Sequence, residues 1–169
     1  FENQLIDFIG VEGSGTWITL DSTDAQFTDC SFNNLNTEMS GTATYRKGNV
    51  IYQSGGSTVF EDCTFNGNSL SGASSTQSEL KGNVYYLESG SASFTNSSFT
   101  NNSLTGVDSN PKGGVFYIES GDLTLEGCVL DSNMVSSNGN GALIYIESDS
   151  ALISIDNISA SGNTGAEMI

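Results

Sequence analysis

The chain has 169 residues, of which 20 are acidic, four are basic and none is histidine, so its formal net charge is −16 at pH 7. A surface this acidic repels phosphate groups, which disfavours nucleic acid as a partner but leaves cations, basic proteins and neutral sugars open. No run approaches 18 apolar residues, so no helical membrane span is predicted in this segment. The three cysteines form no CxxC pair, so neither a zinc site nor a closed disulfide framework is expected.

A repeat of 28–34 residues organises the chain. The copies open at Gly15, Gly48, Gly82, Gly113 and Gly141. The column four residues on contains Thr19, Tyr52, Tyr86, Tyr117 and Tyr145. Later columns contain, in order, Phe27, Phe60, Phe94, Leu125 and Ile153; Cys30, Cys63, Ser97, Cys128 and Asp156; and Phe32, Phe65, Phe99, Leu130 and Ile158. The columns predict a single domain over 1–169 with about five rungs, in which 1–14 is the tail of a preceding partial rung.

Each rung is predicted to contain three short strands. In the second rung they cover 49–53, 57–60 and 63–67, where β-prone residues are separated by turns rich in Gly, Ser and Asn. An asparagine (Asn68, Asn102 or Asn133) ends the part of constant length, and loops at 69–81, 103–112 and 134–140 then shorten from 13 to 10 to 7 residues. No helical period of apolar residues appears. Strands that recur once per rung stack on their copies in parallel, so the predicted fold is all-β, a single-stranded parallel β-helix or solenoid.

Two short motifs resemble those of a known group of proteins. The segments GNVIY (48–52), GNVYY (82–86), GGVFY (113–117) and GALIY (141–145) resemble the GGA[ILV] repeats of chlamydial polymorphic membrane proteins and related surface β-helix proteins. FNGN (65–68) and FTNN (99–102) resemble the FxxN repeats of the same proteins. The resemblance implies a right-handed β-helix of the pectin-lyase-like type. It does not select one role, because such repeats also occur in adhesins, fibres and polysaccharide-active enzymes.

Alternation along the first strand predicts an exposed face. Six residues after the opening glycine stand Glu88, Glu119 and Glu147, which cannot all be buried unpaired. Because side chains two apart share a face of a strand, the positions two and four residues after the glycine are expected to face solvent as well. The predicted exposed face therefore holds Val50, Val84, Val115 and Leu143 beside Tyr52, Tyr86, Tyr117 and Tyr145. The opposite face, with Ile51, Tyr85, Phe116 and Ile144, is expected to fill the core, although Gln53 interrupts it.

Two interpretations of the exposed face remain open. The tyrosines either reinforce the sheet, at a few tenths to about 1 kcal/mol per cross-strand pair, or form a contact face for a protein or for sugar rings. The stacked glutamates repel by roughly 0.9 kcal/mol per neighbouring pair even in water. A Ca²⁺ ion, a basic partner or splaying would relieve this. With no calcium-loop motif in the chain, splaying is expected, and no metal site or cofactor is predicted.

The remaining candidates for chemistry favour a structural interpretation. Lys47, Lys81 and Lys112 stack at one corner, where they are expected to be solvated. The cysteines alternate with phenylalanines and are expected to be small buried thiols, with a Cys30 to Cys63 disulfide less favoured. The turn acids Glu61 and Asp62 are expected in open water, where nothing raises the pKa of a general acid. The chain is therefore not expected to be an enzyme.

The sequence as a whole predicts an extracellular or cell-surface structural or adhesive protein. Contact or self-assembly would use the exposed face or the open ends of the coil. One alternative is a carbohydrate-binding module that uses the tyrosines, and a less favoured one is a polysaccharide lyase or glycoside hydrolase. Asn96, Asn101 and Asn157 lie in glycosylation sequons. The chain begins out of phase and shows no cap at either end, which suggests a segment of a longer array.

Overall fold

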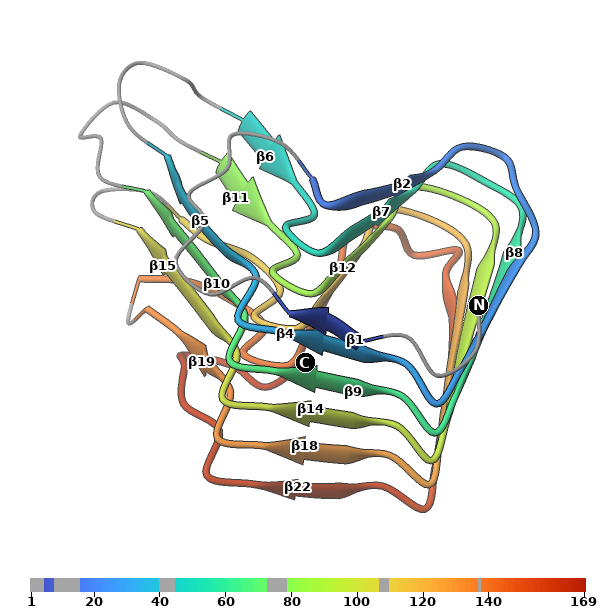
Figure 1. The fold of residues 1–169 in the computed structure, drawn as a ribbon. Coiled ribbons are helices and arrows are strands. Elements are labelled where there is room, and N and C mark those ends of the chain that lie inside the picture. Colours follow the sequence, from blue (N-terminus) through green and yellow to red (C-terminus); the bar gives the residue numbers. More distant parts are fainter. Residues whose placement is uncertain (1–4, 8–15, 40–44, 73–78, 107–109, 137) are drawn as a thin grey trace.

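The computed structural model describes residues 5–7, 16–39, 45–72, 79–106, 110–136 and 138–169. All regular elements in these residues are β-strands, and all the strand pairs formed by them are parallel. The strands lie in sheets that run along one axis, with successive coils stacked in chain order (Figure 1). The predicted parallel β-solenoid is confirmed.

Three long sheets form the main coil. The first contains β2 (Ile18–Leu20), β7 (Ile51–Gln53), β12 (Tyr85–Leu87), β16 (Phe116–Ile118) and β20 (Ile144–Ile146). The second contains β3 (Ala25–Thr28), β8 (Ser57–Glu61), β13 (Ser91–Thr95), β17 (Asp122–Glu126) and β21 (Leu152–Asp156). The third contains β1 (Leu5–Asp7), β4 (Ser31–Asn33), β9 (Thr64–Asn66), β14 (Ser98–Thr100), β18 (Val129–Asp131) and β22 (Ser159–Ser161). Each sheet takes one strand from each coil, as the three predicted strands per rung require.

Two further sets of strands occupy segments that the sequence analysis treated as loops. A fourth sheet contains β5 (Asn36–Met39), β10 (Ser69–Gly72), β15 (Ser103–Gly106) and β19 (Met134–Val135), and a two-stranded sheet contains β6 (Tyr45–Lys47) and β11 (Glu79–Lys81). These two sheets, which we call the arm, project from the main coil (Figure 1). The arm has its own small apolar core, formed by Leu70, Leu80, Leu104, Val135 and Ala142. Two to four residues of alternating pattern are too few to reveal such strands in the sequence.

The strand register matches the sequence alignment in the first four rungs and differs in the last. Phe27 pairs with Phe60, and Phe60 with Phe94, as predicted. Leu125, however, pairs with Ile155 rather than with Ile153. The connection before β21 (147–151) is two residues longer than the one before β17 (119–121), and this displaces the second and third strands of the last rung, while β20 pairs as predicted. The expected places of Asp156 and Ile158 are therefore also wrong: Asp156 pairs with Glu126, and Ala160 takes the place beside Leu130.

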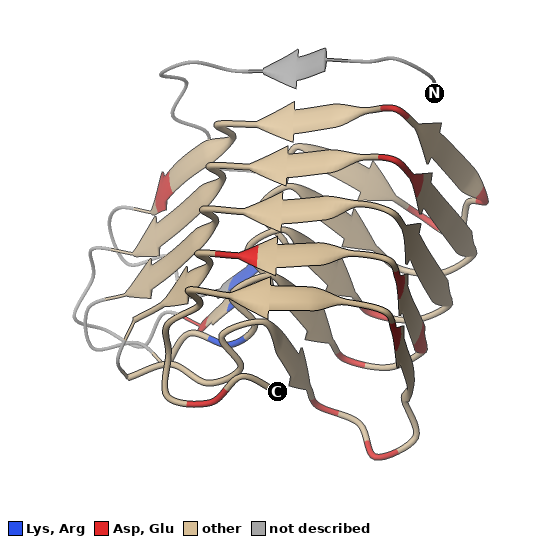
Figure 2. Ribbon diagram, turned by 90° about the horizontal axis from the view of Figure 1, so that it is seen from below, with Lys and Arg blue, Asp and Glu red and all other residues tan. Residues whose placement is uncertain are grey.

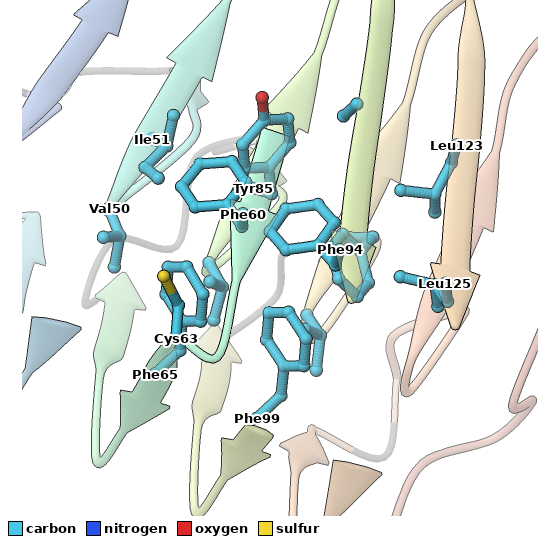
Figure 3. Close-up of a cluster of buried hydrophobic side chains, with 14 of the residues drawn as sticks. Val50, Ile51, Phe60, Cys63, Phe65, Tyr85, Phe94, Phe99, Leu123 and Leu125 are labelled. Carbon is cyan, nitrogen blue, oxygen red and sulfur yellow. The ribbon is translucent and has the colours of Figure 1, made fainter. Parts of the chain in front are cut away.

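Stacked phenylalanines fill the main core (Figure 3). One column contains Phe27, Phe60 and Phe94, and the other contains Phe32, Phe65 and Phe99. Neighbouring rings within a column are nearly parallel, with centroids 4.5–4.8 Å apart. Since neighbouring strands lie about 4.8 Å apart, this stacking follows directly from in-register pairing. Cys30, Cys63 and Cys128 lie beside the rings as buried thiols that form no disulfide, which confirms that prediction.

The one polar residue of the predicted inner face, Gln53, is accommodated without a change of register. It is fully buried. Its side-chain amide donates to the carbonyls of Gly55, Gly56 and Ser91 at 3.0–3.2 Å, and its side-chain oxygen accepts a hydrogen bond from the hydroxyl of Tyr85. The buried amide therefore carries no unpaired donor.

A buried asparagine ladder closes the corner between the third sheet and the arm. The side-chain amide of Asn68 donates to the side-chain oxygen of Asn102 at 2.9 Å, that of Asn102 to Asn133 at 2.9 Å, and that of Asn133 to Asn163 at 3.0 Å. Each of these three amides also donates to a backbone carbonyl of the preceding coil. An amide can do this because it carries both donors and an acceptor.

Truncation in the middle of this ladder is expected to be costly. Asn102→Ala removes an acceptor from the backbone and side chain of Asn68, so buried donors are left unpaired, and we expect a loss of about 3 kcal/mol in the free energy of unfolding. Urea denaturation followed by circular dichroism measures it. The matched variant Asn66→Ala, on the half-buried outer face, should cost less than about 1 kcal/mol. Equal costs for the two variants would contradict a structural role of the ladder.

Candidate functional site

The tyrosine column lies in the angle between the first sheet and the arm. A glycine turns the chain from the arm into the first sheet in each coil, and Gly48, Gly82, Gly113 and Gly141 all have φ between 65° and 74°. At Gly82 an added Cβ would lie 2.5 Å from the carbonyl oxygen of Tyr85 and 3.1 Å from the Cβ of Tyr117. Only glycine suits both the left-handed backbone and this close approach. The opening glycine of each repeat therefore brings the arm against the tyrosines.

The prediction of an exposed apolar face is wrong. Val50, Val84 and Val115 are fully buried and belong to the main core, and Leu143 is 5 % exposed. The strand begins only at Ile51, so residues 49–50 form a corner where the alternation of a strand does not hold. Of the tyrosines, Tyr86 and Tyr117 are fully buried, while Tyr52 and Tyr145 are half-buried.

Lysines from the arm cover the tyrosine rings. The Nζ of Lys47 lies 5.1 Å from the ring centroid of Tyr86, and Lys81 lies 5.1 Å from that of Tyr117. Lys112 lies 4.6 Å from the ring centroid of Tyr145. Each lysine stands over the tyrosine of the next coil, at a distance typical of a cation–π contact. The prediction that Lys47, Lys81 and Lys112 form a solvated corner is therefore wrong.

Glutamates beside the tyrosine column contact both the tyrosine hydroxyls and the lysine amines. Tyr52 donates a hydrogen bond to Glu88 at 2.5 Å, Tyr86 donates to Glu119, and Tyr117 donates to Glu147 at 2.6 Å. Each hydroxyl therefore reaches the glutamate of the next coil.

Lysines of the same chain supply the counter-charge. The Nζ of Lys47 lies 3.0 Å from Glu88 and 3.1 Å from Glu119, and Lys112 lies 3.7 Å from Glu147. The third lysine, Lys81, pairs with Glu79 at 3.1 Å. The expected splaying of the glutamates is therefore wrong. We call the combined set of tyrosines 52, 86, 117 and 145, lysines 47, 81 and 112, and glutamates 88, 119 and 147 the Tyr–Lys–Glu ladder.

These contacts shift the titration of the ladder. The hydrogen bonds from Tyr52 and Lys47 lower the pKa of Glu88, and the hydrogen bond from Tyr117 lowers that of Glu147. For Glu119, burial acts to raise the pKa, but the hydrogen bonds from Tyr86 and Lys47 outweigh it and the pKa is lowered. Burial, followed by the hydrogen bond to Glu88, raises the pKa of Tyr52 to about 12. Tyr52 therefore stays a protonated donor, and Glu88, Glu119 and Glu147 stay ionised acceptors, at neutral pH.

Other candidate residues lie at the corners of the coil. Glu61 is half-buried and accepts a hydrogen bond from Gln26 at 3.3 Å, while Asp62 is exposed in a left-handed turn. The sequon residues Asn96, Asn101 and Asn157 are all exposed in the same type of turn. Acidic residues are spread over several corners, whereas the basic residues gather on one side (Figure 2). Within the described part of the chain, no group of three His, Cys, Asp or Glu side chains could hold a metal ion.

Family models, curated proteins and solved structures give no significant match to this chain. A search of the described residues also finds no helix long and apolar enough to cross a membrane. The fold defines the class of the protein, a parallel β-solenoid.

The ladder is expected to make stability depend on acid pH. Because the folded-state pKa values of Glu88, Glu119 and Glu147 lie below the ordinary value of 4.5, their stabilisation is fully present above pH 4.5 and is lost as the pH falls through the lowered values. The free energy of unfolding, measured in urea between pH 6 and pH 3, should fall. The Glu88→Gln variant should show a shallower fall than the wild type. Identical pH profiles would exclude Glu88 as a source of the dependence.

A pair of substitutions separates the tyrosine ring from its hydroxyl. Tyr117→Ser removes a fully buried ring and should cost about 3–5 kcal/mol in the free energy of unfolding. Tyr117→Phe keeps the ring and removes only the hydrogen bond to Glu147, so it should cost about 1 kcal/mol. Thermal and urea unfolding measure both values. A negligible cost for Tyr117→Ser would show that the ring is not part of the packing.

Proposed function

We propose that this chain is a non-catalytic structural or adhesive β-solenoid of the extracellular space or cell surface. The observation that carries the proposal is the continuity of its side-chain columns. Each column links neighbouring coils through a repeated contact: the phenylalanines in the first three coils, the asparagine ladder from Asn68 to Asn163, and the Tyr–Lys–Glu ladder from Tyr52 to Glu147. An array of this kind yields a stiff rod of repeated units. The surface location rests on the resemblance of the repeats to those of surface β-helix proteins.

The titration of the carboxyl groups favours a non-catalytic role. A glycoside hydrolase needs one carboxyl group whose pKa is raised, so that it can act as a general acid. Among the described carboxyl groups, those with a resolved shift are Glu88, Glu119 and Glu147, and all three are lowered. Their counter-ions are lysines of the same chain, which hold them ionised.

The alternative of a carbohydrate-binding module loses its main support. It relied on exposed ring faces as a stacking platform for sugars. Tyr86 and Tyr117, at the centre of the column, are fully buried under lysines, so their faces are not accessible. The ladder is better explained as reinforcement of the angle between the arm and the first sheet.

Contact with partners is proposed at the outer edge of the last coil. Strands β21 and β22 each lie at the edge of a sheet, with one neighbouring strand. Among the described residues, the exposed large apolar side chains are concentrated nearby: Val129, Met134, Leu152, Ile155, Met168 and Ile169. Leu152 is 69 % exposed. An open strand edge beside apolar side chains favours the addition of further strands, and we propose that further coils stack on it, from the same protein or from another copy of it.

Self-association is expected to depend on these side chains. Analytical ultracentrifugation of the wild type should show a mass that rises with concentration, whereas the double variant Leu152→Lys, Met168→Lys should stay monomeric with an unchanged circular dichroism spectrum. The control Ser93→Lys adds a charge to the half-buried outer face of β13, two strands in from the edge strand β21, and should associate like the wild type. A wild type that is monomeric at all concentrations would overturn the proposed contact.

A further inference from the structure

The interior of the arm changes from apolar to polar in its first described coil. Thr37 pairs in register with Leu70, and Arg46 pairs in register with Leu80. Both leucines belong to the apolar core of the arm. Because paired residues of parallel strands in register face the same side, Thr37 and Arg46 point into that same interior. Thr37 is 1 % exposed and Arg46 is 6 % exposed.

Among the described residues, both of these side chains carry buried polar atoms without a hydrogen-bond partner. The Oγ1 of Thr37 and the Nε and Nη2 of Arg46 make no hydrogen bond. Among the described residues, the ion pairs are made by lysines and not by this arginine. Burial lowers the pKa of Arg46 only to about 10, so the guanidinium is still charged at neutral pH. A buried charge that cannot neutralise itself requires a counter-charge.

We propose that Arg46 and Thr37 form a binding site for a small oxyanion, of the phosphate, sulfate or carboxylate type, in the interior of the arm. The free Nε and Nη2 form one edge of the guanidinium, which is the edge that binds two oxygens of such an anion in parallel. The hydroxyl of Thr37, which also has no hydrogen-bond partner among the described residues, supplies a further donor from β5, in the other sheet of the arm.

The acidic character of the whole chain does not prevent an oxyanion from binding at Arg46 and Thr37. Its four basic residues are Arg46, Lys47, Lys81 and Lys112, and all of them lie on β6, on β11 or on the bridge that continues that sheet. At physiological ionic strength, fields are screened over about 8 Å, so carboxylates beyond that distance have little effect on Arg46. The glutamates close to the three lysines are already paired with them. The general repulsion of anions should show as a modest affinity rather than as an absence of binding.

The test is a titration of the folded protein with inorganic phosphate, sulfate or acetate at constant ionic strength, with chloride as the reference. Isothermal calorimetry should give saturable binding of phosphate to the wild type. The Tm should rise by about 5 °C when phosphate is at one hundred times its dissociation constant. Arg46→Leu, which copies Leu80 of the next coil, should abolish both effects and be at least as stable as the wild type in chloride.

Two further variants control for charge and geometry. Lys112→Gln removes one positive charge from the same side of the molecule and should keep the phosphate response. Arg46→Lys keeps the charge but cannot bind two oxygens in parallel, so it should weaken phosphate binding at least about tenfold. The absence of saturable binding to the wild type by all three anions would overturn the proposal, and so would an unchanged response in Arg46→Leu.

Discussion

Parallel hydrogen bonding in register between coils is the constraint on which the rest of this structure depends. It places every side chain about 4.8 Å from its counterpart in the next coil, so each residue type must tolerate contact with itself. Phenylalanine does so by stacking, as Phe60 and Phe94 show at 4.5 Å. Asparagine does so because its amide both donates and accepts, as Asn102 and Asn133 show. This requirement explains why the same residue types recur at the same positions of successive repeats.

Charged columns need a different solution, because a glutamate cannot pair with another glutamate. Here the partner comes from a neighbouring coil. Tyr117 donates to Glu147 of the next coil, and Lys47 lies between Glu88 and Glu119. The stagger turns a column of like charges into a cross-linked ladder. It also explains why a chain with so few lysines keeps them at the start of successive repeats, where each can reach a ring and a carboxylate.

The arm buries the Tyr–Lys–Glu ladder and adds a second apolar core to that of the main coil. Its strands fold back beside the first sheet at glycines such as Gly82, and its lysines close over Tyr86 and Tyr117. A surface that would otherwise present aromatic rings to partners becomes part of the scaffold. Contact with a partner is therefore proposed at the open strand edge near Leu152. Arg46 is the exception inside the arm, since it is a buried charge that the described chain does not pair.

Periodicity in the sequence was sufficient for the parallel solenoid, the three strands per rung, the phenylalanine columns and the buried cysteines, because each follows from local alternation repeated at one spacing. It misplaced the last rung, since a connection two residues longer before Leu152 shifts the register without disturbing the local pattern. It could not show that Val50 is buried, because residues 49–50 form a corner where the alternation of a strand does not hold. It could not show that Tyr86 is buried either, because alternation separates the two faces of a strand but does not reveal a second layer that covers one of them. That layer comes from the arm, whose strands are too short to be predicted from alternation in the sequence. The sequence by itself determined how the coils stack, and only the tertiary structure decided which face of the stack meets water.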